Sequence, residues 1–393
     1  MSQNKKLSYI SGFSKWDIRK KLEFMSSLTG IDVKVLMKYA WPDDDIANII
    51  NKLSENTVAH FPFPYGLAPN FKIQNKDYVL PLVTEESSVV AALANAAKIW
   101  YNKGGFRNKI LGTVKKGQIH IFWDGQPEIF FKHFNKFKTK LLNSVREISG
   151  KMESRGGGIL DVELIDKTKE LPNYYQLDVS FDTLDAMGAN FINSVLERMA
   201  KAFEEIMTQQ FPGKSPVEIV MSILSDFTPD CLVKAWVECP IDDLDNVVKG
   251  MSGKEFAAKF EKAIQISQVD VSRAVTHNKG IFNGIDALAL ATGNDWRTIE
   301  SAGHAYAARN GSYQGLTKIY MDAKMFSFSI ELPMNIGVVG GVTTLHPMAA
   351  LSMKILKEPT GKELMGLFAI AGLASNFAAI TALIGKGIQK VHI

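Results

Sequence analysis

The sequence predicts a mixed α and β protein in which a small α/β unit is inserted into a larger one of helices and sheet. The chain has 393 residues, which is too long for one ordinary hydrophobic core. Strand-like and helix-like segments alternate through residues 112–226, whereas helical segments dominate on both sides. We therefore expect the large unit to comprise residues 1–111 and 227–380 and the small unit residues 112–226.

Composition excludes several classes of protein. Apolar residues make up 46% of the chain, charged residues 22%, and the net charge is +4. This is typical of a soluble globular protein, and no block of lysine or arginine indicates nucleic-acid binding. The first residues lack the apolar stretch of a signal peptide, so we expect a cytoplasmic protein. Cys231 and Cys239 are expected to be buried and unbridged, and no Cys-x-x-Cys pattern predicts a metal site.

One apolar segment, residues 364–385, is long enough to cross a membrane and carries no charge. It contains Ser375, Asn376 and Thr381, and it is rich in alanine and glycine rather than leucine and isoleucine. Small residues suit a helix that is packed closely on all sides. We therefore predict a buried helix, with Asn376 pointing inward.

Local patterns place the remaining elements. Residues 7–60 read as helical, and residues 61–83 as strands with a hairpin turn at residues 75–76. Thr84 is predicted to cap a helix whose first turn holds Glu85 and Glu86. These glutamates either take part in the chemistry of a site or only complement the helix dipole. Residues 127–131, PEIFF, are expected to form a strand.

The densest group of reactive side chains lies in residues 273–297, RAVTHNKGIFNGIDALALATGNDWR. Two polar clusters, around Lys279 and Asp295, flank the apolar run ALALA. We expect Lys279 and Asp295 to be the ends of one rigid unit that faces a common cavity. Two polar loops joined by a buried helix are the alternative. Gly280 and Gly284 would let the backbone approach a ligand closely.

A second candidate site is the sequence DAMGAN, residues 185–190, which opens a predicted helix. Exposed N–H groups at a helix start attract phosphate, and Gly188 allows close approach. Asp185 would cap the helix or accept hydrogen bonds from a ribose. The segment does not match the GxGxxG fingerprint, so a Rossmann unit is not predicted.

Taken together, these motifs resemble class II (bacterial) hydroxymethylglutaryl-coenzyme A reductases. The likeness rests on TEESSVVAALANAAK, RGGGILDVEL, DAMGANFINSV, THNKGIFNGID followed by TGNDW, GVVGGVTTLHP, LASNFAAITAL and GIQKVH. It implies an inserted ferredoxin-like cofactor domain of 112–226, NADPH as cofactor with NADH as the alternative, no metal, and a homodimer with its active site at the subunit interface. The implied reaction reduces the thioester to mevalonate in two steps and releases coenzyme A.

The resemblance also implies residue roles. The catalytic set is Glu86 (with Glu85 as second choice), Lys279, Asp295 and His392. Substrate contacts would come from Ser88, Arg273, Asn283 and Asn376, and cofactor contacts from Asp185, Met187, Gly188 and Asn190. In this scheme Lys279 stabilises the oxyanion beside Asp295, and Glu86 keeps its proton through burial or through proximity to Asp295. His392 protonates the coenzyme A thiolate, and Arg273 pairs with the substrate carboxylate.

Some positions depart from the family pattern. Residues 55–59 read ENTVA where the family has ENVIG, and Asp226 stands where a relative has a cofactor-facing asparagine. Family members continue past the histidine with a helical flap, of which residues 381–393 would be the start. Two other functions remain open, namely another NAD(P)-dependent acyl-coenzyme A or aldehyde reductase, and a non-catalytic acyl-coenzyme A binding protein.

Overall fold

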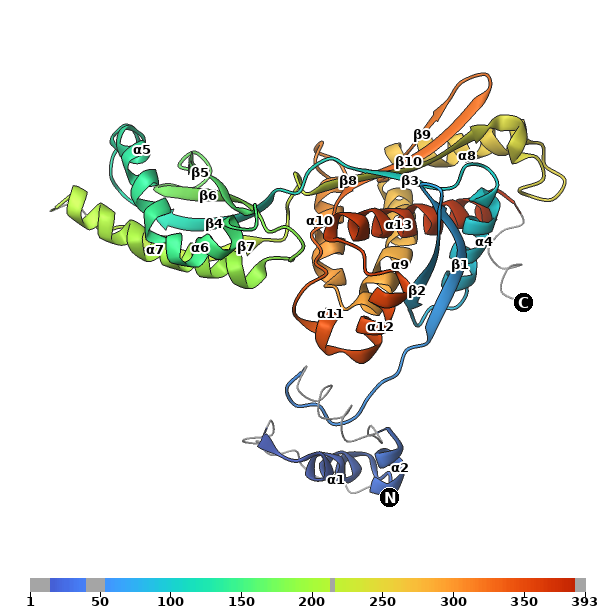
Figure 1. Cartoon of the computed structure of the whole chain (residues 1–393), viewed down its shortest axis with the longest axis horizontal. Coiled ribbons are helices and arrows are strands. Elements are labelled where there is room, and N and C mark those ends of the chain that lie inside the picture. Colours follow the sequence, from blue (N-terminus) through green and yellow to red (C-terminus); the bar gives the residue numbers. More distant parts are fainter. Residues whose placement is uncertain (1–14, 40–53, 213–215, 386–393) are drawn as a thin grey trace.

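The computed structural model describes residues 15–39, 54–212 and 216–385. In Figure 1 the chain forms a large unit of helices and sheets and a smaller sheet-and-helix unit set to one side of it. Each has its own hydrophobic core: one cluster draws its buried residues from Ile119 to Met207, and the other from segments before and after that range. The mixed helix-and-sheet fold that the sequence predicts is therefore confirmed.

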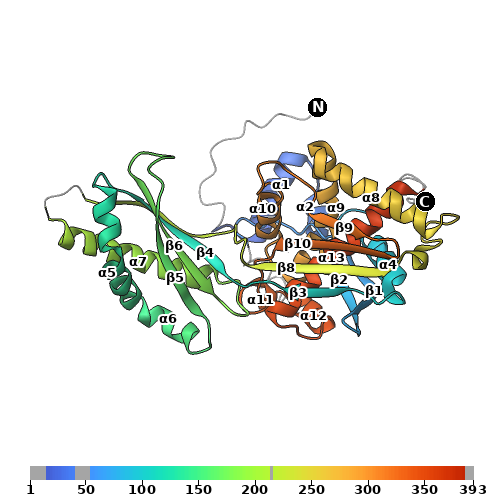
Figure 2. The ribbon, with the colours of Figure 1, turned by 90° about the horizontal axis from the view of Figure 1, so that it is seen from above.

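The small unit has the order β-α-β-β-α-β, with α5 and α6 in the first crossover. Its strands form one antiparallel sheet in the order β5-β6-β4-β7, which is the ferredoxin-like topology. The helices cover one face of this sheet (Figure 2). The elements are β4 (Lys115–Phe122), α5 (Pro127–Ser144), α6 (Arg146–Glu153), β5 (Gly158–Asp166), β6 (Tyr174–Asp182), α7 (Ala189–Gln210) and β7 (Glu218–Ser225).

The prediction of a strand at residues 127–131 is wrong, because these residues form the first turns of α5. Pro127 occupies the first helical turn, where a missing N–H costs nothing, and the helix continues to Ser144. Phe130, Phe134 and Phe137 are buried on one face at helical spacing. A short apolar run such as PEIFF fits a strand or a helix equally well until its continuation is taken into account.

The large unit contains a hairpin and a four-stranded sheet in the order β3-β8-β10-β9. Its hairpin turns at Gln74 and Asn75, both with positive φ, one residue from the predicted position. The strands are β1 (Tyr65–Ile73), β2 (Lys76–Val83), β3 (Arg107–Ile110), β8 (Leu232–Pro240), β9 (Thr317–Met321) and β10 (Met325–Pro333). Cys231 and Cys239 are buried and unbridged, as predicted.

The other elements of the described chain are helices. They are α1 (Ile18–Thr29), α2 (Val33–Leu36), α4 (Val89–Tyr101), α8 (Gly253–Val269), α9 (Val271–Thr292), α10 (Trp296–Ala307), α11 (Val342–Leu345), α12 (Pro347–Ile355) and α13 (Gly361–Ile384). Short 3-10 turns lie at Met37–Tyr39 and Ile241–Leu244. Helices α1 and α2 form an N-terminal arm that Figure 1 shows apart from the large unit.

Helix α13 is the core helix of the large unit. By length and composition it could cross a membrane, but 72% of its most apolar window is buried inside the protein. It packs against α9 through glycine: a Cβ at Gly284 would lie 2.5 Å from the Ala371 carbonyl oxygen. The prediction of a buried helix is confirmed, and Gly284 serves close helix packing rather than the approach of a ligand.

Candidate functional site

The candidate site centres on an ion pair between two segments far apart in sequence. The Lys279 ammonium lies 2.6 Å from an oxygen of Glu86, and the two side chains are 59% and 45% exposed. Lys279 lies on the outer face of α9, and Glu86 lies in the turn between β2 and α4. An exposed ion pair of this kind adds little to stability. Both charged groups are instead open to a molecule bound beside them.

The turn that carries Glu86 is not a helix start of the predicted kind. Helix α4 begins at Val89, so Glu85 and Glu86 precede it and do not complement its dipole. The Thr84 hydroxyl accepts the Glu86 N–H at 3.1 Å, which stabilises the turn rather than the helix. Ser88 has a left-handed backbone with φ 72°, an uncommon conformation for a non-glycine residue. The prediction that Thr84 caps the helix is therefore wrong, because the N-cap residue of α4 is Ser88.

Helix α9 places further polar groups beside Lys279. Asn283 is one turn later on the same face, and Asp286 follows after another turn. One carboxyl oxygen of Asp286 is buried and has no hydrogen-bond partner among the described residues. Burial, and then the charges of Glu300 and Glu85, raise the pKa of Asp286 to about 8. The sequence offered one signal for this group, namely its seven-residue spacing from Lys279.

The structure does not bring Asp295 to Lys279 within one chain. Residues 271–292 are a continuous helix, so thirteen residues at 1.5 Å each separate Lys279 from its end by about 20 Å. Asp295 caps α10, and the Arg297 guanidinium holds both of its carboxyl oxygens at 3.0 Å. Burial opposes ionisation of Asp295, but Arg297 outweighs it and lowers the pKa. The prediction that Lys279 and Asp295 belong to one rigid unit is confirmed, because α9 connects them. The prediction that both face a common cavity is wrong for a single chain.

Asn376 points into the core, as predicted. Its side-chain N–H donates to the His277 carbonyl oxygen at 3.0 Å, and its oxygen accepts the Thr317 hydroxyl at 3.2 Å. His277 also contacts Thr317, and burial followed by the Arg273 charge lowers the pKa of His277 to about 3. This network joins α9, β9 and α13. A direct contact between Asn376 and substrate stays a prediction.

The DAMGAN segment forms the loop and first turn that join β6 to α7. Gly188 caps α7 with φ 99°, and a Cβ there would lie 2.5 Å from Thr183. The expectation that Asp185 caps this helix is wrong, because Gly188 is the cap residue. Asp185 accepts the Gly361 N–H at 2.7 Å and so contacts the first residue of α13, whose N-cap is Thr360. The loop therefore joins the two units while the first turn of α7 keeps N–H groups without intrahelical acceptors.

Two other positions complete the account of the predicted site. His392 lies outside the described residues. Asp226, at the return from the small unit, accepts the Thr298 hydroxyl of α10 at 3.2 Å, so it lies near Asp295 and Arg297. In the sequence, nothing but the departure from the family pattern marked Asp226.

The sequence and the fold can be compared with known proteins. The family model of hydroxymethylglutaryl-coenzyme A reductase matches residues 17–393. The chain is 35% identical to 3-hydroxy-3-methylglutaryl-coenzyme A reductase of Archaeoglobus fulgidus, over 98% of this chain and 85% of that protein. It is also 35% identical to a probable reductase of the same kind from Borreliella burgdorferi, over 89% and 77% of the two chains.

Solved structures agree with the sequence relatives. The class II 3-hydroxy-3-methylglutaryl-CoA reductase from Streptococcus pneumoniae, bound to NADPH in open conformations, superposes with a TM-score of 0.78. The identity is 35%, and the match covers 95% of this chain and 99% of that one. Because the family model spans nearly the whole chain and two relatives exceed 30% identity over most of it, the chain belongs to the hydroxymethylglutaryl-coenzyme A reductase family.

Proposed function

We propose that this protein reduces hydroxymethylglutaryl-coenzyme A to mevalonate and coenzyme A with NADPH. The observation that carries the proposal is the ion pair of Lys279 and Glu86, which sets a cation and a carboxyl group side by side within reach of solvent. Family membership supplies the substrate, and the NADPH bound to the pneumococcal relative supports the cofactor.

The chemistry asks for these two groups. Negative charge develops on the carbonyl oxygen of the substrate during each reduction, and a fixed ammonium stabilises that charge more than it stabilises the ground state. Lys279 provides the ammonium. The neighbouring Glu86 supplies the proton that neutralises the oxygen. Arg273, six residues earlier on α9, pairs with the free carboxylate of the substrate, and His392 protonates the departing thiolate.

The N-terminus of α7 fits a dinucleotide cofactor. Free N–H groups and the helix dipole attract a pyrophosphate, and Gly188 leaves room for backbone approach. NADPH would supply hydride when bound there, through contacts with Met187, Gly188 and Asn190. Asp185 fits a ribose contact less well, because one of its carboxyl oxygens is bonded to Gly361. On this basis residues 112–226 form the cofactor domain, and residues 1–111 and 227–380 the substrate domain.

We further propose a cytoplasmic homodimer in which the partner's copy of α10 supplies Asp295. Two observations support this. Lys279 and Asp295 cannot meet within one chain, because the intact helix α9 separates them. The N-terminal arm and α9 also expose apolar side chains that a partner would cover, namely Leu28, Ile31, Val35, Met37, Val271 and Val275.

A spectrophotometric assay tests the function. Purified protein is given hydroxymethylglutaryl-coenzyme A with NADPH or NADH, and mevalonate and free thiol are measured as products. We expect two molecules of NADPH to be oxidised for each thiol released. Turnover of other acyl-coenzyme A esters in preference to this substrate would favour a different reductase. Binding without turnover would contradict the proposal.

A further inference from the structure

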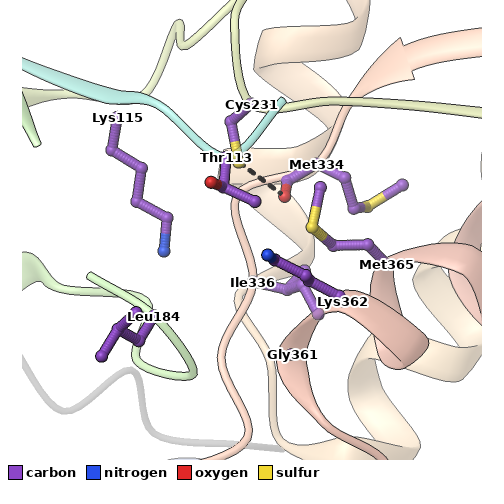
Figure 3. A pocket seen from close by; sticks show the side chains of 9 residues that line it. All are labelled: Thr113, Lys115, Leu184, Cys231, Met334, Ile336, Gly361, Lys362 and Met365. Atoms are coloured by element: carbon purple, nitrogen blue, oxygen red, sulfur yellow. Dashed lines mark hydrogen bonds between the residues drawn. The ribbon is translucent and has the colours of Figure 1, made fainter. Parts of the chain in front are cut away.

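Lys115 is a buried cation at the junction of the two units. Two connecting segments, residues 111–114 and 226–231, join the units. The first is hydrogen-bonded through Leu111, Gly112 and Val114 to Asp230 and Leu232 at the end of the second. Lys115 opens β4 directly after the first segment and is only 3% exposed. Together with Thr113, Cys231, Gly361 and Lys362 it lines a pocket with room for about one water molecule (Figure 3).

All three donors of the Lys115 ammonium are used on one loop. The ammonium donates to the Thr183 hydroxyl at 2.7 Å, to the Ala186 carbonyl oxygen at 2.6 Å and to the Met187 carbonyl oxygen at 3.0 Å. An ammonium has three donors and no acceptor, so this set satisfies it completely. The loop it holds, residues 183–188, is the one that leads into α7.

Holding these carbonyl groups fixes the N–H groups that follow them. In a trans peptide the C=O and the next N–H point in opposite directions. With the carbonyls of Ala186 and Met187 turned toward Lys115, the N–H groups of Met187 and Gly188 are turned away from it. The ammonium therefore sets the direction of the Met187 and Gly188 N–H groups, which lead into α7.

The opposite side of the loop is held by the large unit. The Asp185 carboxylate accepts the Gly361 N–H at 2.7 Å, and its carbonyl oxygen accepts the Val338 N–H at 2.9 Å. A Cβ at Gly337 would lie 2.4 Å from the Met187 nitrogen. The loop is thus closely packed between the units, with Lys115 as its anchor in the small one.

A buried charge at this place is costly. Desolvation lowers the pKa of Lys115 to about 8, and the negative charges of Asp182 and Asp185 oppose this shift by favouring the ammonium. An apolar side chain of similar length would avoid that cost. The position of the lysine is explained by the loop conformation that its three hydrogen bonds enforce.

We propose that Lys115 is a positioning residue for the cofactor. It holds residues 183–188 so that the N–H groups at the start of α7 receive the pyrophosphate of the nicotinamide dinucleotide. This inference rests on the proposed function, which assigns the same loop to cofactor binding. Lys115 itself is buried beneath the loop and acts through it.

The test measures the dissociation constant for NADPH by fluorescence titration of the full chain. Lys115→Met keeps the side-chain length and removes the donors, so we expect affinity for NADPH to fall at least about tenfold, the effect of losing charged hydrogen bonds. The KM for the acyl-coenzyme A substrate should stay within about twofold, since the loop does not contact the α9 site. A purely structural role would lower stability and leave NADPH affinity of the folded fraction unchanged.

Lys116→Met is the matched control. Lys116 is the next residue on β4 and is also largely buried, but it pairs with Asp178 at 2.7 Å rather than with the loop. Its variant should bind NADPH as the wild type does. Equal NADPH affinity in folded Lys115→Met and Lys116→Met would overturn the inference.

Asn190→Ala separates this inference from the proposed function. If Asn190→Ala binds NADPH normally, the cofactor assignment of the loop is wrong. If it weakens binding while Lys115→Met does not, the positioning role alone is wrong.

A pH titration covers the case in which Lys115→Met does not fold. The groups that face Lys115 are Asp182, Asp185, Cys231 and Lys362, and the thiol, with a pKa of about 11, stays protonated near pH 8. Wild-type affinity for NADPH should weaken as pH rises through about 8, where the ammonium loses its proton. In Lys115→Arg, which stays charged, the affinity should not change. A flat wild-type profile would contradict the proposal.

Discussion

Lys115 and Lys279 differ in burial and in the number of hydrogen-bond partners that their ammonium groups have. Lys115 is buried at the junction of the units and satisfies its donors within one chain. Lys279 is 59% exposed on α9 and has a single carboxylate partner, Glu86, within the described part of the chain. The first arrangement is complete as it stands and fixes a backbone conformation. The second leaves two of three donors for other groups, which is what a site that binds substrate, and in our proposal a partner's Asp295, requires.

The comparison also separates two kinds of predicted site residue. Those that depend on one local segment, such as Gly188 at the start of α7, lie where the sequence places them. Those that depend on two segments meeting, such as Lys279 and Asp295, do not come together in one chain. A rigid helix between them decides this, because its length exceeds the reach of either side chain.

The largest expected effect is on catalysis. Lys279→Met should lower kcat by at least about 100-fold, the loss that follows removal of one group stabilising an oxyanion. Thermal unfolding should change little, because the Lys279–Glu86 pair is exposed. Lys259→Met, on the exposed side of α8, serves as the control and should retain wild-type kcat. Near-normal turnover in Lys279→Met would remove this lysine from the mechanism.

Mixed dimers of two inactive variants test whether Lys279 and Asp295 of one active site come from different subunits. Lys279→Met and Asp295→Asn are expected to be inactive alone. If the two residues of one site come from different subunits, an equal mixture refolded together should regain up to about a quarter of wild-type activity, since half the dimers are mixed and each has one intact site. No recovery, with mixed dimers verified by mass spectrometry, would place both residues in the same subunit's site.

The last prediction concerns how the protonation of Asp286 makes the stability of the fold depend on pH. The pKa of Asp286 is about 8 when folded, against an ordinary value of 3.8. The folded state therefore holds a proton that the unfolded state releases, so the contribution of Asp286 to stability is fully present below pH 4 and is lost as pH rises to about 8. The loss is at most about 1.4 kcal/mol for each pH unit in this window. Asp286→Asn removes the titrating group, so its melting temperature should exceed that of the wild type increasingly between pH 5 and 8. Parallel melting curves across that range would show that Asp286 is ionised in the fold.

The sequence predicted those features that depend on a residue's immediate neighbours. Strand and helix periodicity predicted the mixed helix-and-sheet fold, and the small residues of 364–385 identified a buried core helix, with Asn376 turned inward. The motifs around Glu86 and Lys279 were sufficient to identify the family. Local ambiguity caused the errors. PEIFF is compatible with a strand or a helix, and the left-handed Ser88 precedes a helix that begins at Val89, later than the Thr84 pattern predicts.

What only the tertiary structure decided are the pairings between distant segments. No local pattern shows that Glu86 meets Lys279 across 193 residues, that Asp185 accepts an N–H at the start of α13, or that Lys115 holds the loop that leads into α7. These contacts form because the β2–α4 turn packs over α9 and because two crossing segments bring the units together. Sequence periodicity reports which face of an element is buried, but the partner of a charged group is set by the packing of whole elements.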